Sequence, residues 1–297
     1  MSVVGFVVVR AGALTTVQDL GRAGYAHLGV PRSGALDVPA YRLANRLVGN
    51  TEGAAALETT VNGCALRAVR PLLVAVTGAP CPVRVGGRPA AWGAPVRVPG
   101  GAVLEVGAAT AGLRSYVAVA GGLAVEPVLG SRSADLLSGL GPAPLADGAE
   151  LPVGSGRGAG WAVADVLPYG PAGGELVLPL VPGPRDGWFA PGALTALVTG
   201  EYAVSPASNR IGLRTVGPAL ERAAGRDGEL PSEPMVPGAV QVPPDGRPVV
   251  FLADHPTTGG YPVIGVVPEE SLPAAAQSVP GSRIRFVVLR SAARPAG

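Results

Sequence analysis

The side chains that could do chemistry are concentrated in the last third of the sequence. They combine carboxylates, amides, hydroxyl groups and one arginine, in the order Asn209, Arg210, Glu233, Gln241, Asp254, Thr257, Thr258 and Tyr261. Carboxylates accept hydrogen bonds from N–H groups, while amide, hydroxyl and guanidinium donors hold a carbonyl oxygen. The set therefore suits a urea-like or lactam-like group. A purely structural loop is the alternative interpretation.

Two further polar segments lie in the first half of the chain. In the stretch 15–37, Ser33 and Asp37 come directly before a predicted helix, whose N-terminal N–H groups favour an anionic or carbonyl oxygen. In the stretch 130–135, Arg132 stands between two serines and could hold a carboxylate or phosphate through its planar fork. The structural alternatives are that Asp37 only caps the helix and that Arg132 belongs to a turn with Asp135.

Composition removes several kinds of chemistry. All 23 basic residues are arginine, so the chain offers no lysine for a Schiff base, a general base or a P-loop. His27 and His255 have no clear third ligand, so we expect no metal site. Cys64 and Cys81 form no CxxC pair and are expected to be core thiols. No GxSxG, HExxH or dinucleotide-binding motif is present.

The elements that must position these residues are mainly strands. Short apolar runs alternate with turns rich in glycine and proline, of which the chain has 45 and 32. The pattern predicts strands at 3–9, 72–76, 116–120, 248–253 and 261–267, and hairpins over 82–92, 95–106 and 240–252. Consecutive short strands without long helices favour antiparallel barrels or sandwiches.

Helices are expected to be few. Asp37 is a good N-cap, Pro39 suits the first turn, and apolar residues repeat at helical spacing from Ala40 to Leu47. A second short helix is predicted from about Ser133 to Gly139. The Gly/Pro-rich stretch 154–174 predicts a boundary between two domains, 1–165 and 166–297.

Charge and hydropathy limit the kinds of partner and the cellular location that we expect for this chain. The net charge is +2 with no basic run, which argues against a nucleic-acid surface. No apolar stretch reaches the roughly 18 residues that span a bilayer, so we expect no membrane association. The first apolar run is better explained by a strand than by a signal peptide, and we expect a cytoplasmic protein.

Several segments together resemble one family, from about Val8 to Phe286. They are TTVQDLGRAGY, GVPRSGALD, YRLANRLVGN, VAVTGA, SYVAVAGG, VLGSRSAD, SNRIGLR, SEP, GAVQVPPDG and TTGGYP. The family they resemble is allophanate hydrolase subunit 2, also called the biotin-dependent carboxyltransferase or 5-oxoprolinase C-subunit family. It includes antikinase-partner proteins of sporulation control. Two departures from its pattern are Asn209, where an aspartate is usual, and His255-Pro256, where an Arg-Gln pair is usual.

The resemblance implies a mainly β fold of two cyclophilin-like antiparallel β-barrel domains with a few short helices. It also implies a partner of the subunit 1 type, similar to the 5-oxoprolinase B subunit, and a LamB/YcsF-type A subunit. The implied activity is ATP-dependent opening of 5-oxoproline to glutamate, with ATP used by the complex. On this hypothesis Asp254, Glu233 and Gln241 orient the lactam, and Arg210 or Arg132 steadies an activated intermediate.

Two other functions stay open. One is the carboxyltransferase half of a biotin-dependent urea or amide carboxylase; the biotin carrier and the ATP-using domain would then be supplied elsewhere. The other is a non-catalytic regulatory protein that sequesters an inhibitor of a kinase.

Overall fold

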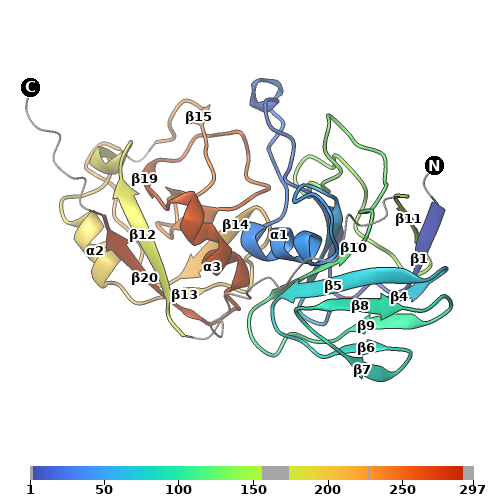
Figure 1. Ribbon diagram of the computed structural model, residues 1–297. Coiled ribbons are helices and arrows are strands. Elements are labelled where there is room, and N and C mark those ends of the chain that lie inside the picture. The colour runs from blue at the N-terminus through green and yellow to red at the C-terminus, as the bar shows by residue number, and fades with distance from the viewer. Residues whose placement is uncertain (1–2, 156–173, 227, 290–297) are drawn as a thin grey trace, which may run out of the picture. The chain divides into compact units, whose positions relative to one another are not determined.

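The computed structural model describes residues 3–155, 174–226 and 228–289 (Figure 1). Within it the chain divides into two compact units. Unit 1 is assigned residues 1–23 and 33–173, and unit 2 residues 24–32 and 174–297. The short stretch 24–32 therefore belongs to unit 2 although both its flanks belong to unit 1. The predicted boundary at 165/166 falls outside the described residues and stays a prediction.

The described residues of unit 1 form two β-sheets and one helix. The six-stranded sheet has the order β11-β1-β4-β9-β6-β7 and the five-stranded sheet the order β2-β3-β10-β5-β8. The strands are β1 Val3–Arg10, β2 Thr15–Gln18, β3 Ala56–Thr60, β4 Ala65–Ala68, β5 Leu72–Gly78, β6 Val83–Val85, β7 Arg88–Ala90, β8 Pro95–Val98, β9 Val103–Val106, β10 Arg114–Val119 and β11 Glu150–Val153.

The core of unit 1 lies between its sheets. Phe6, Leu66 and Leu104 from the larger sheet form one buried cluster with Leu57 and Val117 from the smaller sheet. The opposite face of the smaller sheet is covered by the helix α1 (Val38–Leu47), which lies over β5 and β10 (Figure 1). Along β2, β3 and β10 the side chains therefore alternate between the two buried layers.

Unit 2 is a closed barrel of seven strands in the order β12-β19-β16-β17-β14-β13-β20. Most neighbours are antiparallel, whereas β12 and β20 run parallel and side by side (Figure 1). The barrel strands are β12 Leu176–Pro182, β13 Tyr202–Val204, β14 Gly212–Val216, β16 Ala239–Gln241, β17 Val249–Phe251, β19 Val263–Val266 and β20 Arg283–Val288. A separate two-stranded sheet pairs β15 Glu233–Pro234 with β18 Thr258–Gly259. Its helices are η1 Ala26–Leu28, η2 Asp186–Trp188, α2 Ala193–Thr199, η3 Glu269–Ser271 and α3 Leu272–Gln277.

The structure confirms much of the predicted local pattern. The mainly β fold is present, with a closed barrel in unit 2 and two separate sheets among the described strands of unit 1. The hairpins β6–β7 and β16–β17 pair as predicted. The helix α1 begins after Asp37, whose side chain accepts a hydrogen bond from the Ala40 N–H, as the capping prediction required. No described helix is long and apolar enough to cross a membrane.

Two local predictions were wrong. The strands over 95–106 do not form a hairpin, because β8 pairs with β5 in one sheet while β9 pairs with β4 and β6 in the other. The turn at 99–101 thus connects the two layers, and turn residues alone cannot distinguish these connections. The predicted helix 133–139 is irregular, because the Asp135 carboxylate accepts hydrogen bonds from the N–H groups of Leu137 and Ser138 and stabilises a turn.

Candidate functional site

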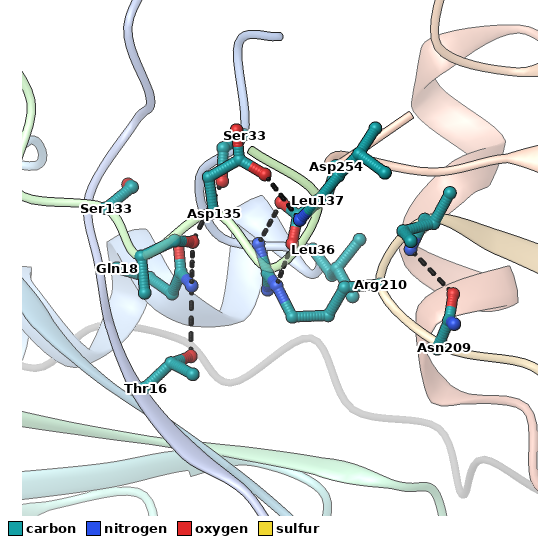
Figure 2. Close-up of polar contacts among 12 residues, drawn as sticks. Thr16, Gln18, Ser33, Leu36, Ser133, Asp135, Leu137, Asn209, Arg210 and Asp254 are labelled. Carbon is teal, nitrogen blue, oxygen red and sulfur yellow. Dashed lines mark hydrogen bonds and ion pairs between the residues drawn. The ribbon is translucent and has the colours of Figure 1, made fainter. Parts of the chain in front are cut away.

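Arg210 and Asp254 form a fully buried ion pair in unit 2. Arg210 Nε and Nη2 donate to the two Asp254 oxygens, each at 2.9 Å (Figure 2), and the side chains are 1% and 0% exposed. Arg210 precedes β14 and Asp254 follows β17, and these strands are neighbours. The Asp254 N–H also donates to the Arg210 carbonyl at 3.0 Å. This geometry joins two strand ends and favours a structural role for Asp254, whose predicted catalytic role stays a prediction.

Asn209 forms a local turn next to this pair. Its Oδ1 accepts from the N–H groups of Ile211 at 2.9 Å (Figure 2) and Gly212 at 3.2 Å. An aspartate at this position would accept the same two bonds, so the departure from the family pattern preserves the turn while removing a charge. Its predicted contact with substrate stays a prediction.

Four of the predicted residues lie close together beside the barrel. The strands β15 and β18 pair, which places Glu233 opposite Gly259 and Pro234 opposite Thr258. Gln241 Nε2 donates to the Tyr261 carbonyl at 3.2 Å. A Cβ on Gly259 would lie 2.6 Å from that same Nε2, so the absence of a side chain there lets Gln241 approach. We call Glu233, Gln241, Thr258 and Tyr261 the ribbon cluster.

An arginine that was not among the predicted site residues completes this cluster. Arg185 Nε donates to both Glu233 oxygens, at 3.0 and 3.1 Å, and Arg185 Nη2 also bonds to the carboxylate. This hydrogen bonding lowers the pKa of Glu233 despite its partial burial. Glu233 is therefore an ionised acceptor at neutral pH. The nearby Glu229 raises the pKa of Tyr261, which keeps the phenol protonated.

Thr257 and His255 contribute to the loop that leads into β18. The Thr257 carbonyl accepts from the Met235 N–H at 2.9 Å, which aligns the two strands of the ribbon. The His255 ring is buried and stacks on Phe251 with centroids 5.7 Å apart. Burial lowers the pKa of His255, so the ring is neutral at pH 7. Among the described residues no group of His, Cys, Asp and Glu could hold a metal ion.

In unit 1, buried polar side chains of the five-stranded sheet hold the segment before α1 in place by hydrogen bonds. The Asp37 N–H donates to the Tyr116 hydroxyl at 2.7 Å, and that hydroxyl donates to Glu58 at 2.8 Å. The Leu36 N–H donates to the same Glu58 carboxylate at 3.0 Å. Burial, with Glu58 beside it, raises the pKa of Tyr116 well above its usual value. Asp37 is thus occupied both as a cap and as a backbone anchor.

Asp19 organises the segment that contains Arg132. Its carboxylate accepts from the hydroxyls of Ser131 and Ser133 and from the Arg132 N–H, each at 2.6 Å. The two serines that suggested an anion site therefore bind Asp19. Arg132 Nε donates to the Val125 carbonyl at 2.7 Å, so its side chain is partly committed to the backbone.

Ser33 and Gln18 meet on one backbone carbonyl. Ser33 Oγ and Gln18 Nε2 both donate to the Ala134 oxygen at 3.0 Å, and Gln18 Nε2 also donates to Thr16 Oγ1 at 2.9 Å (Figure 2). Ser33 has the left-handed φ of 55°, an uncommon conformation for a residue with a side chain. Gln18 was not among the predicted site residues. The alternation of Thr16 and Gln18 with the apolar Val17 is the signal that could have identified a polar layer here.

Comparison with known proteins gives one consistent family. The family model described as the carboxyltransferase domain, subdomain A and B, matches residues 28–288. The chain is 38% identical over 283 residues to the 5-oxoprolinase C subunit of Escherichia coli (strain K12), covering 94% of this chain and 90% of that protein. It is 32% identical to the 5-oxoprolinase C subunit of Haemophilus influenzae, covering 94% and 90%.

Larger proteins contain the same domain. Urea amidolyase of Lachancea kluyveri is 33% identical over 95% of this chain, which spans 17% of that protein. The crystal structure of the K. lactis urea amidolyase matches with a TM-score of 0.87 and 30% identity, over 98% of this chain and 19% of that one. The crystal structure of TTHA0988 matches with a TM-score of 0.86 and 38% identity, over 96% and 55%. The chain therefore belongs to the carboxyltransferase domain family, subdomains A and B.

Proposed function

We propose that this chain is the C subunit of an ATP-dependent 5-oxoprolinase and acts with partner subunits in opening the lactam ring to glutamate. The observation that carries the proposal is the match to two bacterial 5-oxoprolinase C subunits along 90% of their length. The matches to urea amidolyases cover less than a fifth of those proteins. A relation along nearly the whole length supports a shared role better than a shared domain does.

The ribbon cluster is our proposed contribution of unit 2 to this reaction. Glu233 is ionised and holds Arg185, whose side chain is 42% exposed and whose guanidinium can bind a carboxylate or phosphate. Gln241 supplies an amide for a carbonyl oxygen on the Glu233 side of the ribbon, whereas the Thr258 side chain lies on its other face. ATP and two further proteins, a B-like subunit of the subunit 1 type and a LamB/YcsF-type A subunit, are proposed to complete the enzyme. The cytoplasm is the proposed location.

The variant Glu233→Gln tests this assignment in the assembled complex. Glutamine keeps the size of the side chain but removes the charge that holds Arg185. We expect kcat/KM for ATP-dependent glutamate formation to fall about tenfold or more. The expected melting temperature is close to that of the unchanged protein, because the Glu233 side chain is partly exposed.

The matched control is Glu201→Gln in the same unit. Glu201 also pairs with an arginine, Arg283, at 3.1 Å, but both side chains are largely exposed at 87% and 72%. This variant should retain full activity. Unchanged kcat/KM in Glu233→Gln would remove the ribbon cluster from the reaction, and a complex that never forms glutamate from 5-oxoproline would refute the proposed function.

A second candidate function follows from the family match itself. The matched domain is a carboxyltransferase, and the same fold occurs within urea amidolyases. The chain would then transfer a carboxyl group to urea, using biotin carried by another domain. Urea-dependent carboxylation that avidin abolishes would support this function, and glutamate formation that avidin does not affect would exclude it as the main activity.

A further inference from the structure

Among the described residues of unit 2, the Arg185 guanidinium uses only one of its two bidentate edges. Its Nε and Nη2 form the edge that bonds to both oxygens of Glu233. Nη1 has no hydrogen-bond partner in the described part of the chain and contacts solvent, and the side chain is 42% exposed. We call the edge formed by Nη1 and the second N–H of Nη2 the open edge; a ligand can reach it from outside the chain.

The position of this guanidinium is fixed by its surroundings. The Arg185 N–H donates to the Val263 carbonyl at 3.1 Å, and the Arg185 carbonyl accepts from the Trp188 N–H at 3.0 Å. Val263 is the register partner of Gln241, which belongs to the ribbon cluster. Because Glu233 holds the side chain as well, little conformational freedom is lost when a ligand binds. Arg185 is thus a preorganised donor beside the ribbon cluster.

The open edge has the geometry of a carboxylate site. Its two parallel N–H groups match the two oxygens of a carboxylate, and a charged donor makes each bond stronger than a neutral donor would. The hydrogen bonds to Glu233 raise the pKa of Arg185, so the guanidinium stays charged. Glu233 also neutralises the pair, so an anion gains more from the hydrogen bonds than from net charge. We therefore expect a moderate preference for a carboxylate, of about tenfold.

We propose that the open edge of Arg185 binds the carboxylate of the substrate and thereby selects lactams that carry one. The assignment rests on the proposed function and deepens it, since 5-oxoproline has a carboxylate on the carbon next to the ring nitrogen. Urea has no carboxylate, so the same residue favours the lactam over urea. A phosphate group is the other anion that matches this edge, and the experiment distinguishes the two.

The test compares 5-oxoproline with 5-oxoprolinamide, in which a neutral carboxamide replaces the carboxylate. Dissociation constants for both compounds are measured by calorimetry on the assembled complex with a non-hydrolysable ATP analogue. The unchanged complex should bind 5-oxoproline about tenfold more tightly than the carboxamide. In Arg185→Met, which removes every donor of the side chain, this preference should fall to about onefold. A purely structural role of Arg185 would weaken the binding of both compounds equally and leave the preference unchanged.

The control is Arg283→Met, which removes the arginine of the exposed pair with Glu201 in the same unit. This variant should keep the preference of about tenfold. Arg185→Lys is the second test variant if Arg185→Met does not fold. Lysine keeps the positive charge without the planar fork, so the preference should fall to about threefold.

The outcomes separate this assignment from the proposed function. A folded Arg185 variant that keeps the full preference overturns the assignment while the proposed function stands. A variant that keeps the preference but raises KM for ATP also overturns it, and assigns the open edge to a phosphate. Equal or absent binding of the two compounds by the unchanged complex overturns the assignment too. An unchanged complex that forms no glutamate from 5-oxoproline overturns the proposed function as well.

Discussion

The ion pair between Arg210 and Asp254 gives a direct test of whether Asp254 works in catalysis or in folding. With the two side chains 1% and 0% exposed, removing one partner breaks a buried ion pair and leaves a buried charge that has lost this pairing. Breaking a pair of this kind typically costs about 3–5 kcal/mol of stability. We therefore expect Asp254→Asn and Arg210→Met each to destabilise unit 2 by about this amount. Both single variants lose the same ion pair, so the loss of stability in the double variant should be smaller than the sum of the two single losses by about 2 kcal/mol.

Unit 2 can be followed by its own fluorophore. The chain has three tryptophans, at 92, 161 and 188, and Trp188 lies in unit 2. We replace the other two tryptophans with phenylalanine and follow urea denaturation by the fluorescence of Trp188. This signal reports the unfolding of unit 2 alone, whereas a single two-state fit of the whole chain would combine both units. Glu201→Gln, at an exposed pair, is the control and should change stability by about 1 kcal/mol or less.

Activity measured on the same variants distinguishes the two roles. If Asp254 is structural, the activity of the folded fraction of Asp254→Asn stays near that of the unchanged protein. If it orients substrate, kcat/KM falls far more than the folded fraction does. A single-variant cost below about 1 kcal/mol, or a double variant as unstable as the simple sum, would refute the reasoning from burial.

Two further predictions concern buried groups near the proposed sites. Tyr116→Phe removes the hydroxyl that joins the Asp37 N–H to Glu58, and should destabilise unit 1 by about 1–3 kcal/mol in urea denaturation followed by Trp92; no loss would mean that water replaces the hydroxyl. Burial lowers the pKa of His255 in the folded protein. As the pH falls, this side chain is therefore protonated in the unfolded chain at a higher pH than in the folded chain. The stability of unit 2 should therefore be complete above about pH 6.5 and decrease as the pH drops towards the folded-state pKa. In His255→Phe this part of the pH dependence should disappear, and an unchanged profile would contradict the assignment.

Features that depend on a few neighbouring residues could be predicted from the amino-acid sequence. Asp37 and the apolar spacing after it encode α1, because a capping bond and one helical face are local properties. The turns of the β6–β7 and β16–β17 hairpins are local in the same way. The absence of lysine removed whole reaction classes without any knowledge of the fold.

The burial of the polar side chains and the partner of each one depend on how distant segments pack together, so they could not be predicted from local sequence. Nothing local distinguishes β8 and β9 from a hairpin, since their separation into two sheets depends on β5, β4 and β6. Arg185 reaches Glu233 across 48 residues, and Gln18 meets Ala134 across 116. Hydrogen bonds and desolvation act through space, so the ionisation of Glu233 and the burial of Asp254 and Gln18 follow from strand pairing and not from spacing along the chain.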